Sequence, residues 1–150
     1  MRAVVQRVLR AEVTVAGEVV GAVGRGLLVL VGVEESDSEE DAAFIGRKLM
    51  KLRVFDDGKG RMDLSVSDVE GEVLLISQFT LFGDCRKGSR PSFSRAASPE
   101  IAEKLYLQLR ERIYQGGIPI QTGQFRARME VSSINEGPVT LIVDSKQKRF

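Results

Sequence analysis

The chain is organised around one central segment, Gly71-Glu-Val-Leu-Leu-Ile-Ser-Gln-Phe-Thr-Leu-Phe82. Its Val73-Leu-Leu-Ile76 run is apolar without interruption, which predicts a β-strand covered on both faces. Polar side chains follow at Ser77, Gln78 and Thr80, and polar groups away from water need hydrogen-bond partners. These residues either bond to neighbouring backbone within an ordinary core strand or belong to a site that performs chemistry.

Further strands and turns are expected on both sides of this segment. Apolar and β-branched runs predict strands at residues 3–9, 12–15, 19–23, 27–33, 53–55, 118–120, 127–134 and 139–144. Residues 56–60 are expected to form a turn, because Asp57-Gly58 suits positive φ. By composition, residues 135–138 predict a turn between the last two strands.

Two helices are predicted from their start signals and apolar stripes. The first begins in the acidic run 36–41, where Ser36 precedes Glu39 by three residues as in a capping box. The second begins at Ser98, which is followed by proline, and ends at Gly116-Gly117. The buried stripes are expected at Ala42, Ile45, Leu49 and Leu52, and at Ile101, Leu105, Leu109 and Ile113.

Composition bounds the architecture and the setting. The 150 residues are 43% hydrophobic and 29% charged without an internal break, which predicts one domain over residues 1–150. The element order predicts a layered β/β/α fold of the mixed α/β class, with largely antiparallel sheets and both helices on one side. With no membrane-length apolar run, no signal-peptide core and a single cysteine, Cys85, we expect a cytoplasmic protein without a membrane partner. A solvated basic tail is expected at Lys146, Lys148 and Arg149.

The chain contains no histidine. This excludes Ser-His-Asp and Cys-His relays and zinc sites built on histidine. A general base would have to be a shifted carboxylate or lysine, a bound water, or a group on the substrate. Asp56 and Asp57 lack the ligand series of a calcium loop, so we expect turn chemistry there and predict no metal and no other cofactor.

A basic segment follows the central strand. Residues 85–99 contain no acidic residue, although the net charge of the chain is only +1. Their cations, with Phe93 among them, are Arg86, Lys87, Arg90 and Arg95. The segment is either a solvated loop or a surface for phosphate and sugar, and loops at strand ends are where scaffolds present binding groups.

Three segments together resemble the D-aminoacyl-tRNA deacylases: Ser77-Gln-Phe-Thr-Leu81, Asn135-Glu-Gly-Pro-Val-Thr140 and Met1-Arg-Ala-Val-Val-Gln-Arg-Val8. The resemblance covers essentially the whole chain. It implies a cytoplasmic homodimer of two sheet layers and helices that removes D-amino acids esterified to tRNA, and in some members glycine from the wrong tRNA. The expected partner is therefore tRNA, and no DNA partner is expected.

The resemblance also implies roles for individual residues. The active site would include Ser77, Gln78, Phe79 and Thr80. A dipeptide that is cis in the family, and that rejects L-amino acids from the partner subunit, matches Gly137 and Pro138. Positions that hold the terminal adenosine match Phe125 and Met129, although Arg126 and Arg128 depart from the small residues expected nearby. Further contact with tRNA is expected from Arg86, Lys87 and Arg90.

Two mechanisms and one non-catalytic alternative stay open. In the first, backbone N–H groups of Phe79 and Thr80, with the Ser77 hydroxyl or Gln78 amide, stabilise the carbonyl oxygen while the ribose 2'-hydroxyl helps activate water. In the second, Thr80 is a nucleophile that forms an acyl-enzyme, although no base is visible. The alternative is a tRNA-binding or aminoacyl-binding module without turnover.

Overall fold

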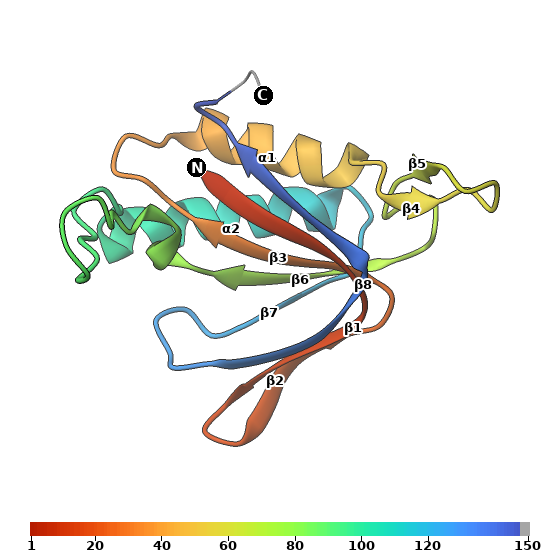
Figure 1. The fold of residues 1–150 in the computed structure, drawn as a ribbon, viewed down its shortest axis with the longest axis horizontal. Coiled ribbons are helices and arrows are strands. Elements are labelled where there is room, and N and C mark those ends of the chain that lie inside the picture. The colour runs from red at the N-terminus through yellow and green to blue at the C-terminus, as the bar shows by residue number, and fades with distance from the viewer. Residues whose placement is uncertain (148–150) are drawn as a thin grey trace.

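The computed structural model describes residues 1–147 (Figure 1). Its elements are β1 (Arg2–Val15), β2 (Glu18–Val23), β3 (Gly26–Gly32), α1 (Glu39–Lys51), β4 (Phe55–Asp56), β5 (Met62–Leu64), β6 (Glu72–Ser77), η1 (Phe79–Phe82), α2 (Pro99–Gln115), β7 (Ile120–Thr122) and β8 (Glu130–Asp144). Within residues 1–147, neither helix has the length and apolar character needed to cross a membrane.

Six strands form one bent sheet in the order β2-β1-β3-β6-β7, with β8 also paired to β1. β1 is antiparallel to β2, β3 and β8, whereas β6 is parallel to β3 and β7. The first half of β1 pairs with β3 and its second half with β2, so the sheet turns away from β3 where β1 changes partner, as Figure 1 shows. The short strands β4 and β5 form a separate ribbon.

Two apolar layers lie on opposite faces of β3 and β6. Both helices cover one face (Figure 1). On that face the strands carry Val29 and Leu75, which pack against the helices. The other face carries Leu74 and Ile76, which pack against Val13 in the bent half of β1. The central apolar run is therefore buried on both sides as predicted, and the mixed α/β class with helices on one side is confirmed.

Several predicted boundaries are wrong. Residues 3–9 and 12–15 form the single strand β1, because β8 pairs with it across the gap. Strand pairing begins at Phe55 rather than residue 53, and β7 begins at Ile120 rather than residue 118. The last two predicted strands are one strand, β8, and residues 135–138 interrupt it rather than ending it.

The helix starts and the tail also differ in part. α1 is capped by Ser38 with Asp41, not by Ser36, and the Ser38 N–H donates to Asp41 Oδ2 over 2.8 Å. Ile101 is exposed, so the buried stripe of α2 begins at Leu105. Lys146 is exposed as predicted, but it does not belong to a free tail, because its Nζ donates to Asp41 Oδ2 over 3.0 Å. Two residues of that predicted tail lie outside the described residues, namely Lys148 and Arg149.

Candidate active site

The polar end of the central segment is a strand end followed by a short 3-10 helix. β6 ends at Ser77, and the backbone N–H of Gln78 donates to the Val31 carbonyl of β3 over 2.7 Å. The chain then turns into η1, which closes when the Gly83 N–H donates to the Thr80 carbonyl over 2.9 Å. Phe79 is 57% exposed, so the polar segment does not continue the buried strand.

A cavity of about 580 Å³ opens beside η1. β3, β6, η1, the loop before α2, α2 itself, the segment between β7 and β8, and β8 supply its lining residues, which are Val31, Val33, Ile76, Ser77, Gln78, Phe79, Phe93, Ala96, Ala97, Pro99, Ala102, Tyr106, Phe125, Arg126, Ala127, Met129 and Val131. The structure thus brings together five predicted site residues: Ser77, Gln78, Phe79, Phe125 and Met129. Thr80 lies outside the lining, and its Oγ1 accepts a hydrogen bond from the Gln78 amide.

Aromatic packing and one buried hydroxyl shape the cavity wall. Phe79 meets Phe93 edge to face, with ring centroids 5.1 Å apart. Tyr106 packs near Phe125, and its hydroxyl donates to the Leu75 carbonyl over 2.7 Å. Burial raises the pKa of Tyr106 to about 12. The lining contains no carboxylate or lysine, so within it no side chain is suited to act as a base near neutral pH.

The basic loop after η1 is partly neutralised by its own neighbours. Arg86 Nη2 lies 2.6 Å from Asp84 Oδ2, and hydrogen bonds from Arg86 hold the pKa of that carboxyl well below its usual range. Arg95 Nε donates to Glu34 Oε1 over 2.9 Å. Of the tRNA-binding candidates in this loop, Lys87 and Arg90 are exposed without an ion pair among residues 1–147.

The Gly137–Pro138 peptide bond is cis and lies in a bulge of β8. On β1, Gln6 pairs with Thr140 of β8 and Val8 pairs with Asn135. One residue, Arg7, lies between the paired positions on β1, whereas residues 136–139 lie between them on β8. Residues 136–139 therefore leave the ladder opposite Arg7. Gly137 has φ +120°, a conformation that requires glycine.

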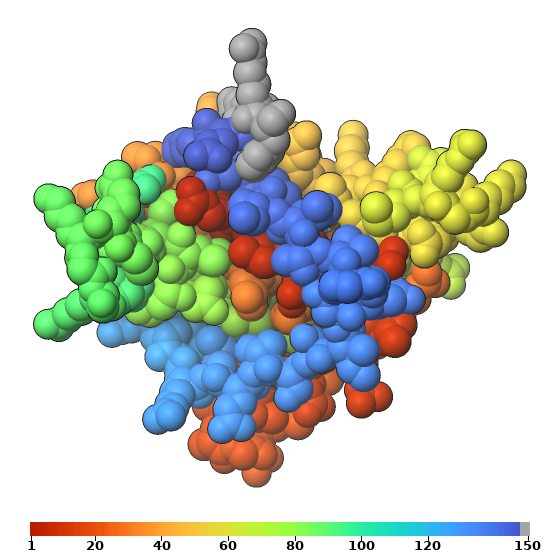
Figure 2. Space-filling view, viewed as in Figure 1, coloured from red at the N-terminus to blue at the C-terminus, as the bar shows by residue number. Residues whose placement is uncertain are grey.

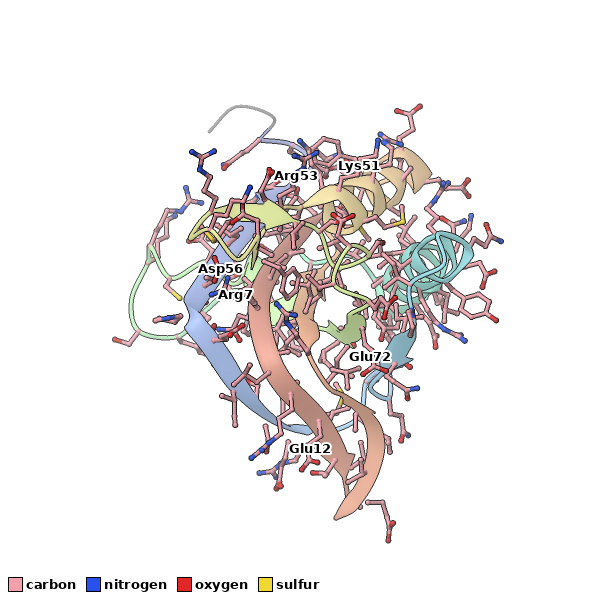
Figure 3. All side chains as sticks on the ribbon, turned by 90° about the vertical axis from the view of Figure 1, so that its right-hand side faces the viewer. Arg7, Glu12, Lys51, Arg53, Asp56 and Glu72 are labelled. Carbon is pink, nitrogen blue, oxygen red and sulfur yellow. The ribbon has the colours of Figure 1, made fainter. Side chains whose placement is uncertain are left out.

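A buried guanidinium holds this bulge. Arg7 Nε donates to the Glu136 carbonyl over 3.3 Å, and its Nη1 donates to the Val54 carbonyl over 2.7 Å. The carboxylates of Glu136 and Asp56 lie 3.3 and 3.7 Å away. Figure 3 shows Arg7 beside Asp56, between β8 and the β4–β5 ribbon. The bulge is thus fixed from two directions, while Gly137 and Pro138 themselves stay exposed.

Within one chain the bulge and the cavity are separate. Neither Gly137 nor Pro138 lines the cavity. Val131 is the residue of β8 that does, and the strand between it and Gly137 spans about 20 Å.

Comparison with known proteins places the chain in a family. The D-Tyr-tRNA(Tyr) deacylase family matches residues 4–144. The chain belongs to this family. A D-aminoacyl-tRNA deacylase of Geobacillus sp. (strain WCH70) is 58% identical, covering 99% of this chain and 97% of the relative. One from Thermosipho africanus is 51% identical, covering 98% and 99%. The predicted resemblance is confirmed.

Two solved structures are similar to this member of the deacylase family. The c-Myc DNA Unwinding Element Binding Protein superposes with a TM-score of 0.90 at 41% identity, covering 96% of this chain and 98% of that one. A probable eukaryotic D-amino acid tRNA deacylase superposes with a TM-score of 0.81 at 18% identity, covering 95% and 98%, and supports the fold.

Sequence reasoning missed two residues that shape the candidate site and the bulge, Tyr106 and Arg7. Arg7 has a visible signal, because it shares the inward parity of Ala3 and Val5 along β1, and a charge at an inward position needs partners. Tyr106 follows Leu105 in the stripe of α2, and nothing in the sequence indicates that its hydroxyl reaches β6.

Proposed function

We propose that this chain hydrolyses the ester between a D-amino acid and the terminal ribose of tRNA. The observation that carries the proposal is the cavity beside η1, which joins a polar strand end to an apolar, aromatic chamber. Relatives matched over nearly their whole length are named D-aminoacyl-tRNA deacylases. The reaction belongs in the cytoplasm, where aminoacylated tRNA is used.

Fixed main-chain dipoles supply the chemistry in this proposal. Hydrolysis builds negative charge on the ester carbonyl oxygen. The first N–H groups of a helix have no partner within it, so those of Phe79 and Thr80 can donate to that oxygen. Each such donor is worth about 3 kcal/mol in the transition state. Ser77 and Gln78 stand at the same edge of the cavity and orient the ester or the attacking water.

A group of the substrate relays the proton. The cavity lining offers no ionisable base near neutrality, so the ribose 2'-hydroxyl beside the ester helps to activate water by accepting its proton while passing its own proton to the leaving 3'-oxygen. Terminal adenosine fits the apolar part of the cavity between Phe125, Met129 and Phe93, where an adenine ring stacks on aromatic side chains.

A second copy of the chain supplies the selection against L-amino acids. Gly137 and Pro138 are exposed and lie too far along β8 to enter their own cavity. The strand that carries them also exposes Ile134, Leu141 and Ile142, which favours contact with another copy. A rigid backbone placed where an L side chain must lie rejects it sterically, while D residues and glycine escape.

Thr80 decides between the two mechanisms. Its hydroxyl already accepts a hydrogen bond from Gln78, and the cavity lining holds no carboxylate or lysine to activate it, so a role as nucleophile is disfavoured. Thr80→Ala is expected to keep near-normal single-turnover deacylation, because its backbone N–H is retained. Abolished turnover in a folded variant contradicts this mechanism and supports the acyl-enzyme. Ser94→Ala, at an exposed hydroxyl of the basic loop outside the lining, is the matched control.

One experiment tests the function itself. Purified protein is incubated with D-tyrosyl-tRNA and L-tyrosyl-tRNA, and loss of the ester is followed against buffer alone. Cleavage of the D ester alone supports the proposal. Cleavage of neither ester, with retained binding, favours the non-catalytic module. Because one solved relative is named for a DNA element, duplex DNA serves as a competitor, and we expect it to inhibit less than uncharged tRNA.

A further inference from the structure

A turn of unusual composition borders the cavity. The Ala127 N–H donates to the Gln124 carbonyl over 3.2 Å, and Arg126, in the third position of this turn, has φ +65°. That position favours glycine or asparagine, because a Cβ crowds the backbone at positive φ. A side chain kept in a disfavoured conformation at the rim of a cavity points to a function for that side chain.

Arg126 and its neighbour Arg128 have no charged partner within residues 1–147. Both side chains are exposed, and they alternate with half-buried Phe125, Ala127 and Met129, which line the cavity. Arg126 itself also lines it. Residues 120–129 contain no acidic residue, so the turn is a purely cationic part of the rim.

A second part of the rim has the same character. It belongs to residues 85–99, which also lack an acidic residue and supply Phe93, Ala96 and other residues to the lining. Figure 2 shows this loop (green) and the segment between β7 and β8 (light blue) at the same end of the molecule. Here Arg86 and Arg95 are neutralised by nearby carboxylates, whereas Arg126 and Arg128 are not.

We infer that Arg126 and Arg128 bind phosphate groups of the RNA strand that leads into the cavity. The inference rests on the proposed function, because terminal adenosine in the cavity obliges the preceding nucleotides to leave across the rim. Guanidinium groups match phosphate oxygens with paired hydrogen bonds, and an exposed side chain reaches them without being desolvated first. Arg126 makes the stronger contact because it stands at the opening, and Arg128 makes the next contact along the strand.

Two substrates separate this inference from the proposed function. One is D-tyrosyl-tRNA, and the other is the D-tyrosyl ester of adenosine, which has no phosphate. Arg126→Gly is expected to lower kcat/KM about tenfold more with tRNA than with the adenosine ester, on the scale of a hydrogen bond to a charged group. The slope of log KM against log salt is expected to fall by about 0.7 for each contact removed. Arg128→Ala is expected to act in the same direction and less strongly.

Replacing Arg126 by glycine separates an effect on stability from an effect on RNA binding. Glycine accepts positive φ without crowding, so Arg126→Gly is expected to raise the melting temperature while weakening tRNA cleavage. Arg126→Lys, which keeps the charge, is expected to recover part of the loss. Arg47→Ala removes an exposed cation from α1, away from the cavity, and is the control expected to change neither substrate.

Each result has one meaning. A selective loss with tRNA, together with the smaller salt dependence, supports the phosphate contacts. Equal losses on the two substrates, or no loss on either, overturn the inference and leave the proposed function standing. Failure of the unaltered protein to cleave either substrate overturns the proposed function instead.

Discussion

The cavity beside η1 and the strand β8 are held in place by different forces. Apolar packing and neutral hydrogen bonds shape the cavity, as in the bond from Tyr106 to the Leu75 carbonyl. Charges hold β8 at its bulge and at its end, in the pairs Arg7–Glu136 and Arg2–Asp144, and the pair Lys146–Asp41 follows just after the strand. One chain therefore contains a cavity whose wall is held by neutral contacts, with the cation of Arg126 at its rim, and a charged support for the segment that we propose to serve a second copy.

This difference follows from what each region has to do. An oxyanion site built from main-chain donors works best where no ion needs solvation and no donor has to reorient. A bulge that reaches outward has little packing of its own, so it needs a rigid multi-donor anchor, which a guanidinium provides. The comparison predicts that removing a charged side chain mainly weakens the support of β8. Removing a neutral hydrogen bond is predicted to weaken mainly the cavity wall.

The largest expected effect comes from removing the anchor of the bulge. Arg7→Met leaves two backbone carbonyls and the Glu136 carboxylate without their donor, and is expected to lower the free energy of unfolding by about 3 kcal/mol. Arg53→Met removes an exposed guanidinium paired with Asp63 and is expected to cost less than about 1 kcal/mol. Urea unfolding measures both. Equal costs would show that burial of Arg7 is irrelevant.

A smaller loss is expected from the neutral side of the comparison. Tyr106→Phe removes the hydroxyl that bonds to the Leu75 carbonyl, and is expected to lower the unfolding free energy by about 1.5 kcal/mol with little dependence on salt. Tyr114→Phe is the matched control, since Tyr114 is 65% exposed. The two variants are compared by thermal unfolding at low and high salt. A strongly salt-dependent cost at Tyr106 would contradict the neutral character of the cavity wall.

The elements with local signals could be predicted from the sequence. Val73–Ile76 reads as a doubly buried strand because its burial needs no knowledge of the rest of the chain. η1 could not be predicted, because the same apolar pattern suits a strand. The turn into η1 depends on Phe82, whose ring packs against β3. The contact is close, because a Cβ atom added to Gly32 of β3 would lie 3.1 Å from that ring.

The supports of the site depend on residues far apart in the sequence. The inward parity of Arg7 was visible, but its partners come from Val54 and Glu136. Likewise, a proline normally marks a strand end, yet β8 continues past Pro138 because β1 pairs with it on both sides of the bulge. Long-range pairing of this kind leaves no signal in the nearby sequence. The positions of the motifs along the chain could therefore be predicted, but the contacts that hold them in place could not.

The smallest expected effect lies at the far end of β8 and depends on pH. Asp41 caps α1 and accepts from Lys146 just after β8. Burial opposes its ionisation, but hydrogen bonds from Ser145, Ser38 and Lys146 prevail and hold the pKa of the carboxyl well below its usual 3.8. A lowered pKa in the folded state stabilises the fold above the pKa of the unfolded state, and this contribution is lost as the pH falls towards the folded value.

Asp41→Asn is therefore expected to cost about 1 kcal/mol at pH 7, the scale of a lost helix cap, and progressively less below about pH 4. Glu40→Gln is the control, because Glu40 is an exposed acid in the same first turn. Urea unfolding from pH 7 down to pH 3 measures the difference between the two variants. A difference that stays constant, or grows, with acidification would mean that the Asp41 charge does not hold this end of β8. The contrast between a charged strand and a neutral cavity wall would then rest on Arg7 and Arg2 alone.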